Sequence, residues 1–153
     1  MVLKSLIVTI GIIFFLLLEF FFPKEKIKFK KKVSRISKNI FFWLVNIGIT
    51  PIIILPITIY ATQFEIHNLF KFDNLILSFL FHLIIVDVFL YWWHRLNHEI
   101  PFLWRFHHVH HLDETLDISS GVRFHFGEVI LSALVRSLLI ILFNISLVIL
   151  LLI

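Results

Sequence analysis

Four long apolar stretches constrain this chain more than any other feature. They cover residues 2–22, 40–60, 75–93 and 129–153, and each contains few charged side chains. A helix of about 20 residues, rising 1.5 Å per residue, crosses the hydrocarbon core of a bilayer, which is roughly 30 Å thick. A helix also pairs its own backbone groups, as lipid requires. The sequence therefore predicts an all-α, multi-pass membrane protein with about four transmembrane helices.

The composition agrees with lipid-facing helices. The chain has 153 residues, of which 59% are hydrophobic and 16% are charged, whereas about a quarter of the residues in a typical soluble domain are charged. There is no cysteine, which excludes disulfides, thiolate metal sites and cysteine nucleophiles. Two prolines, Pro51 and Pro56, interrupt the second apolar stretch and are expected to kink its helix.

The basic residues indicate an orientation. Eight of the 14 basic residues lie between Lys24 and Lys38, and short loops rich in Lys and Arg remain in the cytosol. Counting crossings from this loop places 23–39 and 94–128 in the cytosol and 61–74 on the other side. The net charge of +4 is concentrated beside apolar stretches, so it indicates membrane orientation and no nucleic-acid partner.

Seven of the nine histidines fall between residues 94 and 125. His94 and His98 form an i, i+4 pair, and His107, His110 and His111 form an i, i+3, i+4 triplet. On a helix, residues at these spacings share one face. Neutral imidazoles so arranged can bind a transition metal together, although the spacing alone does not distinguish zinc, iron, copper and nickel. The segment is predicted to be helical and to hold metal at the cytosolic end of the third span.

Four polar residues near this segment are candidates to orient its histidines: Asp87, Tyr91, Glu99 and Asp113. Carboxylates commonly hold a metal-bound imidazole through its other ring nitrogen. For Asp113 a solvated surface charge is an equally good interpretation. Asp87 lies within the third span, where carboxylates are usually paired, and we expect an ion pair or a water-bridged contact with Arg136.

The other histidines are expected to play no part in the site. His67 and His82 are separated from the segment in this topology, and His108 points away from the face of the triplet. Two further metal chemistries fit poorly. A zinc-protease helix places Glu directly after its first histidine, where this chain has Arg95. A haem bound by two histidines would lie buried between spans rather than at the surface.

Three segments together resemble the sterol desaturase / fatty acid hydroxylase superfamily. They read Asp87-Val-Phe-Leu-Tyr91-Trp-Trp-His94-Arg-Leu-Asn-His98-Glu, Leu103-Trp-Arg-Phe-His107-His-Val-His110-His111 and Arg123-Phe-His125-Phe-Gly-Glu128. The ordered boxes HxxxH and HxxHH, separated by Leu-Trp-Arg-Phe, are the specific part of this resemblance. It is close over 87–128 and extends to the flanking spans only in their apolar character.

The resemblance implies a membrane-embedded di-iron oxygenase that hydroxylates or desaturates a sterol-type or fatty-acid-type lipid. Such enzymes use O2 and electrons from a cytochrome b5-like or other donor protein. Iron is the expected cofactor, and zinc is the alternative as the bound metal. The family pattern assigns metal binding to six histidines, namely His94, His98, His107, His110, His111 and His125.

The chain departs from the family pattern after its fourth apolar stretch. Family members normally continue to a third box of HxxHH type, whereas no histidine follows His125 here. Three interpretations remain: a truncated oxygenase, a protein completed by ligands from another chain, or an inactive remnant with a metal-binding or structural role. The expected domains are an N-terminal transmembrane hairpin with a basic cytosolic loop (1–74) and a C-terminally incomplete fatty acid hydroxylase-like domain (75–153).

Overall fold

The computed structural model describes residues 10–11, 13–15, 17–19, 21–22, 29–64, 70, 72–113 and 117–153. These residues form helices and connecting turns, with no strand among them, which confirms the all-α prediction for this part of the chain. The elements are α2 (Phe29–Ile49), η1 (Thr50–Ile54), α3 (Leu55–Ala61), α4 (Leu75–Glu99), α5 (Pro101–His111), η2 (Ile118–Val122), α6 (Phe126–Phe143) and α7 (Leu147–Leu152). Much of the predicted first span, and His67, lie outside the described residues.

Three of the described helices are long and apolar enough to cross a membrane. They are the continuous helix Lys31–Ala61, α4 and α6. Large apolar side chains on them face outward, as Phe41, Ile52, Ile84 and Leu138 do. Such exposure suits lipid, because a soluble protein rarely leaves extended apolar patches uncovered.

The first of these helices passes through its prolines without a break. Thr50–Ile54 forms a π-helical turn in which the Leu55 N–H donates to the Thr50 carbonyl. Pro51 lies in this turn and has no N–H to donate, so the wider turn accommodates the missing bond. The distortion expected from the prolines therefore occurs as a local π turn inside one continuous helix.

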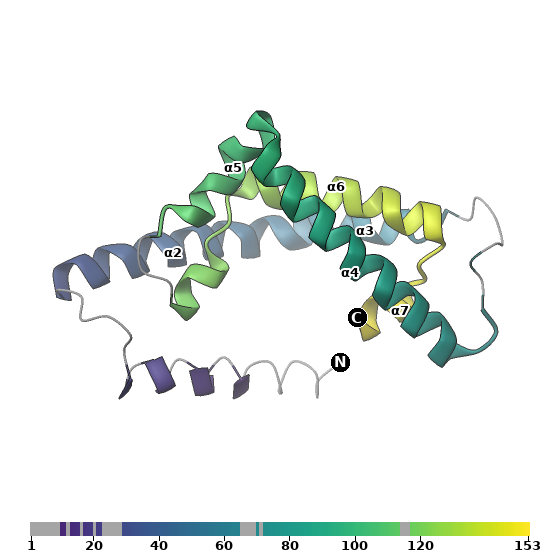
Figure 1. Cartoon of the computed structure of the whole chain (residues 1–153), viewed down its shortest axis with the longest axis horizontal. Coiled ribbons are helices and arrows are strands. Elements are labelled where there is room, and N and C mark those ends of the chain that lie inside the picture. The colour runs from purple at the N-terminus through teal and green to yellow at the C-terminus, as the bar shows by residue number, and fades with distance from the viewer. Residues whose placement is uncertain are drawn as a thin grey trace.

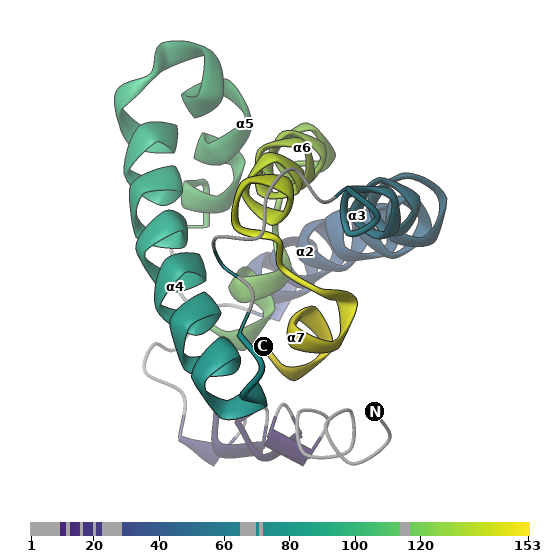
Figure 2. The same ribbon diagram turned by 90° about the vertical axis from the view of Figure 1, so that its right-hand side faces the viewer.

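The helices are arranged around α6. In Figure 1, α6 runs beside the α2–α3 helix while α4 crosses them obliquely, and α5 folds back from the end of α4. Figure 2, turned by 90°, shows α6 between α4 and α3, with α7 below it. Contacts join α3 and α2 to α6, α4 to α5, α5 to α6, and α7 to α4. The end of α4, all of α5 and the start of α6 therefore meet at one end of the molecule.

The predicted fourth span, 129–153, is wrong as a single helix. The helix ends at Phe143, and Asn144 adopts a left-handed conformation with φ of 51°. Ser146 then caps the short helix α7 by accepting from the Ile149 N–H, and Ile149 packs into the small core with Ala61. Asparagine tolerates the left-handed conformation better than most residues. The turn at 144–146 is short and has apolar residues on both sides, which is why hydropathy alone did not locate it.

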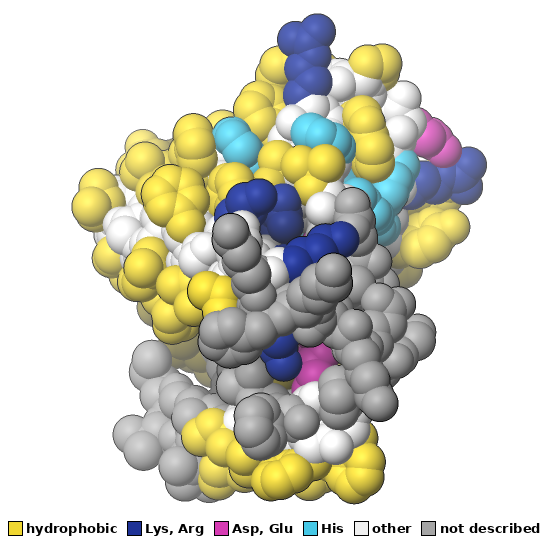
Figure 3. Space-filling model, turned by 90° about the vertical axis from the view of Figure 1, so that its left-hand side faces the viewer, with side chains coloured by type: hydrophobic (Ala, Val, Ile, Leu, Met, Phe, Trp, Pro, Cys, Tyr) yellow, Lys and Arg dark blue, Asp and Glu magenta, His cyan; other side chains and the backbone are white. Residues whose placement is uncertain are grey.

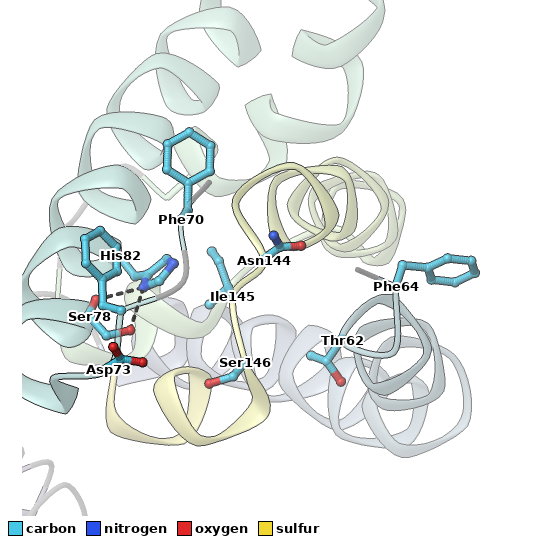
Figure 4. A pocket seen from close by; sticks show the side chains of 10 residues that line it. Thr62, Phe64, Phe70, Asp73, Ser78, His82, Asn144, Ile145 and Ser146 are labelled. Atoms are coloured by element: carbon cyan, nitrogen blue, oxygen red, sulfur yellow. Dashed lines mark hydrogen bonds between the residues drawn. The ribbon is translucent and has the colours of Figure 1, made fainter. Parts of the chain in front are cut away.

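His82 joins α4 to the end of α6, far along the helix from the other histidines of α4. Its side chain is 2% exposed, with Nε2 3.0 Å from the Phe143 carbonyl and Nδ1 2.7 Å from the Ser78 carbonyl. Figure 4 shows it at the edge of a pocket of about 280 Å³ that Asp73 and Asn144 also line. His82 is thus a packing residue, as predicted.

A buried polar network connects α2 to the segment after α5. The Asp113 carboxylate accepts from Arg35 Nη1 at 3.2 Å, from Asn39 Nδ2 at 2.9 Å and from Ser120 Oγ at 2.7 Å, and Arg35 also pairs with Asp117. Burial would raise the pKa of Asp113, but the hydrogen bonds from Asn39, Ser120 and Arg35 outweigh it and hold this pKa below its ordinary value. The two segments predicted to share the cytosolic side are therefore in contact.

Candidate metal centre

A sharp bend between α4 and α5 creates the site. Ile100 has an extended backbone (φ −92°, ψ 117°), and Pro101 begins α5. Proline disfavours the helical conformation in the residue before it and is well tolerated in the first turn of a helix. The chain therefore leaves α4 immediately after the first histidine pair and folds back, which brings the second box against the first.

The histidines of the two boxes converge. Ligand nitrogens of His94, His98 and His107 lie within 4.8 Å of one another. His94 Nε2 is 3.3 Å from His98 Nε2, and His107 Nε2 is 3.2 Å from His111 Nε2. Two nitrogens that bind one tetrahedral metal at about 2.0–2.1 Å are themselves roughly 3.3 Å apart. The spacing within each pair therefore fits shared coordination of a metal ion.

A buried carboxylate orients His107. The Glu128 Oε1 atom accepts from His107 Nδ1 at 2.8 Å, and the two residues are 6% and 1% exposed. With Glu128 ionised, its carboxylate can only accept, so the proton lies on Nδ1 and the Nε2 lone pair is left for a metal. Sequence reasoning missed this role of Glu128. The signal was its place in the Arg123–Glu128 segment, at the first turn of an apolar helix.

The surroundings of His107 and His111 favour the neutral form of both rings. Burial, and after it the nearby rings of His94, His98 and His110, together lower the pKa of His107 from 6.5 to about 4. The pKa of His111 is lowered by burial and then by its neighbours, His107 first among them. A neutral ring has a lone pair to donate, so both residues are ready to bind metal near pH 7.

Trp104 covers one side of the cluster. Its ring centroid lies 5.3 Å from that of His98, 5.5 Å from that of His111 and 6.2 Å from that of His107. The indole therefore limits the access of water to the rings between which it packs. Sequence reasoning recognised this residue only as part of the Leu-Trp-Arg-Phe connection and gave it no role.

The other two predicted ligands lie outside this group of four. His110 stacks on Phe124, with ring centroids 4.7 Å apart, and its ring lies 5.9 Å from that of His107. His125 caps α6, since its Nδ1 accepts from the Gly127 N–H at 3.0 Å. Metal binding by His110 and His125 remains a prediction.

Two of the candidate orienting residues have other partners. Glu99 accepts from Arg95 at 2.7 Å in an exposed pair on α4. Asp113 belongs to the network with Arg35 and Asn39. Neither carboxylate bonds to a cluster histidine among the described residues, because each has a cation closer at hand.

The other two candidate orienting residues, Tyr91 and Asp87, face outward. Tyr91 is 61% exposed and packs on Trp92. Asp87 is also exposed, and within the described chain no ion pair joins it to Arg136, whose Nε donates to the Ser132 carbonyl at 3.2 Å. The predicted ion pair is wrong, and the water-bridged contact between the two residues stays a prediction. Similar depth along two helices does not bring side chains together when both point away from the contact.

Comparison with known proteins adds one finding. The sequence model of the fatty acid hydroxylase family matches residues 79–153. This part of the chain belongs to the fatty acid hydroxylase family. The matched segment begins within α4 and contains both histidine boxes and Glu128. Neither the curated proteins nor the solved structures give a match. Membership in this family of lipid hydroxylases therefore rests on the match of the sequence model to residues 79–153.

Proposed function

We propose that the chain is a membrane-embedded, iron-dependent lipid hydroxylase or desaturase that uses O2 and takes electrons from a cytochrome b5-like or other donor protein. The observation that carries the proposal is the convergence of imidazoles from α4 and α5 at the end of helices whose apolar side chains face outward. Membership of residues 79–153 in the fatty acid hydroxylase family supports a lipid substrate.

The site residues divide the work. His94, His98, His107 and His111 would hold the iron, and His110 and His125 remain proposed ligands. When bound, iron and O2 together supply the oxidising power needed to break a lipid carbon–hydrogen bond. Glu128 holds a proton on His107 Nδ1 and so fixes the direction of the Nε2 lone pair. Trp104 packs over the rings and limits their contact with water.

The proposed topology has four spans with the cluster in the cytosol. Residues 2–22 would form the first span, and the hairpin 1–74 would precede the fatty acid hydroxylase domain 75–153. Three features support this arrangement. The first is the basic segment between Lys24 and Lys38, the second is the contact of Arg35 with Asp113, and the third is the bond from the Ile118 N–H to Glu19 at 3.0 Å.

The alternative function is metal binding without turnover, as in an inactive or structural remnant of the family. It is favoured by the number of ligands, because the structure brings four imidazoles close together. Two irons ordinarily take more ligands than that. The distinction is therefore between a cluster that holds iron and reacts and one that holds metal only.

The deciding experiment compares two adjacent histidines. The purified chain in lipid nanodiscs is assayed for bound metal by mass spectrometry and for oxidised lipid with O2 and a reduced donor. His107→Ala is expected to lose both metal and product. His108→Ala is the matched control, since the contacts described for His108 are with Trp104 and the Arg105 carbonyl, and it should retain both. Metal without product, under every donor tried, would establish the alternative, and equal metal in the two variants would contradict both functions.

A further inference from the structure

Arg123 is a buried cation with no carboxylate partner among the described residues. Its side chain is 7% exposed, its Nη1 donates to Asn39 Oδ1 at 3.4 Å, and its buried Nε has no acceptor in the described part of the chain. No ion pair with Arg123 occurs among those residues either. Buried charges in proteins are normally paired, because removing an ion from water without compensation is costly. Within the described part of the chain, no carboxylate therefore bonds to the charge of Arg123.

A pocket lies beside this arginine. It has a volume of about 170 Å³, which exceeds the roughly 10–15 Å³ that a single water requires. It is lined by Lys31, Ser34, Arg35, Lys38, Leu112, Asp113 and Arg123. The one carboxylate among these residues already bonds to Arg35. Positive charge therefore predominates in the pocket, which suits a small anion.

The depth of the pocket indicates where such an anion comes from. The helix Lys31–Ala61 has 31 residues, a length of about 46 Å at 1.5 Å per residue. The hydrocarbon core takes up roughly 30 Å of it, so the first turns extend into the headgroup region. The pocket lies on those turns. Figure 3 shows Lys and Arg side chains gathered at this end of the molecule, with histidines close by.

We propose that this pocket binds the phosphate of an anionic phospholipid headgroup, with Arg123 and Lys38 as its principal partners. Guanidinium and ammonium groups form short, charge-assisted hydrogen bonds with phosphate oxygens. Such a lipid would hold the start of α2 and Arg123 together at the membrane surface. The site needs no metal, so it is independent of the proposed oxidation. Free inorganic phosphate would offer the same chemistry, and the test separates the two sources.

The test measures thermal stabilisation of the detergent-purified chain by three ligands: short-chain phosphatidic acid, inorganic phosphate and the matching neutral diacylglycerol. Phosphatidic acid is expected to raise the unfolding midpoint at concentrations where the other two have no effect. Lys38→Gln should weaken its apparent affinity roughly fivefold, which is the contribution expected of one cation near an anionic membrane surface. Lys32→Gln is the control, because it removes the same charge from the same helix but Lys32 is not among the described residues of the pocket. The affinity of this variant for phosphatidic acid should be unchanged.

Each other result overturns the proposal. Equal stabilisation by inorganic phosphate would make the ligand a free anion instead of a lipid. Equal weakening by Lys32→Gln would reveal general attraction to the basic helix rather than a pocket. Arg123→Gln should weaken binding at least as much as Lys38→Gln. If it proves too unstable to measure, the Lys38 and Lys32 variants still decide, and unchanged affinity in Lys38→Gln would exclude the site.

Discussion

Glu128 holds the imidazole of His107 in one tautomer, with the Nδ1 proton toward α6 and the Nε2 lone pair toward His111. The carboxylate and the histidine are both buried, so water does not compete for this bond. The histidine pair on α4 is exposed by contrast, and no buried carboxylate bonds to it among the described residues. Control of ligand geometry is therefore concentrated on His107.

Replacing Glu128 by Gln should lower metal affinity roughly 10- to 100-fold, the usual effect of changing a residue that orients a ligand. The amide keeps the size of the side chain and an acceptor oxygen but removes the charge. A competition titration with a chelator of known affinity measures the change. Glu99→Gln is the control, because Glu99 bonds to Arg95 on the exposed face of α4, and its affinity should match the wild type. A larger effect at Glu99 would contradict the assigned role of Glu128.

The stability of the metal-free chain should depend on pH through His107. Its pKa is about 4 in the folded state and 6.5 when unperturbed, so over this range the unfolded chain binds more protons than the folded one. The free energy of unfolding should therefore fall as the pH decreases from about 6.5 to about 4. Thermal unfolding in detergent across this range measures the trend. His107→Gln should flatten it, and a stability that increased on acidification in this range would rule out the assignment.

At the scale of elements, a glycine sets the distance between α5 and α6. A Cβ atom on Gly127 would lie 2.7 Å from the Phe106 ring, closer than carbon atoms can approach. Only glycine therefore lets the first turn of α6 reach α5, and this approach carries Glu128 to His107. The same turn is capped by His125, which gives that residue a structural function whether or not it binds metal.

Gly127→Ala should destabilise the chain by about 1–3 kcal/mol, the usual cost of forcing extra volume into a packed contact. It should also weaken metal binding, since α6 would have to move away from α5. Gly121→Ala is the control, because nothing lies within 4 Å of the Cβ it would add. Adding Phe106→Ala should remove most of the effect of Gly127→Ala. The unfolding midpoints of the wild type, Gly127→Ala, Gly121→Ala and the double variant Gly127→Ala/Phe106→Ala test this. A Gly127→Ala protein as stable as Gly121→Ala would contradict it.

The sequence predicted which histidines converge better than it predicted the contacts between helices that position them. The spacing of His94 and His98, and of His107 and His111, placed each pair on one helical face, and the structure confirms that the pairs converge. The bend at Pro101 was not predicted, nor was the bond of Glu128 to His107. Such contacts join residues that are distant in the sequence, and periodicity describes only neighbours on one helix.

The boundaries of the apolar helices show the same limit. The start of α4 at Leu75 agrees with the prediction, because Asn74 caps it by accepting from the Ile76 and Leu77 N–H groups. The end of α6 does not, because the polar turn residues Asn144 and Ser146 lie within a longer apolar stretch that continues into α7. Hydropathy measures whether a segment suits a lipid environment, and it does not show where a helix ends and the chain turns. A capping residue was the better signal in both places.

At the scale of the whole molecule, the Arg35–Asp113 network joins the N-terminal part to the fatty acid hydroxylase part. Arg35 and Asp113 are 78 residues apart in the sequence, and the family match begins only at residue 79. The long α2–α3 helix is therefore held to the histidine-bearing segment by buried polar bonds as well as by its packing on α6.

Asp113→Ala should be strongly destabilising, by about 3–5 kcal/mol, because it leaves the buried Arg35 guanidinium with an incomplete set of carboxylates. Glu99→Ala removes a carboxylate from an exposed pair on α4 and should change little. Chemical unfolding in mixed micelles compares the two variants. If they were equally stable, the network would not be holding the two parts together.

The unequal exposure of the cluster has a consequence for how metal is acquired. His94 and His98 are exposed, whereas His107 is buried. The cluster therefore has one side open to solvent, which we call the open flank, and one side closed to it. An ion can reach the open flank while still carrying part of its hydration shell and then exchange those waters for imidazoles. Loading, and removal by a small chelator, can then take place after the chain has entered the bilayer, with α4 and α5 still packed together.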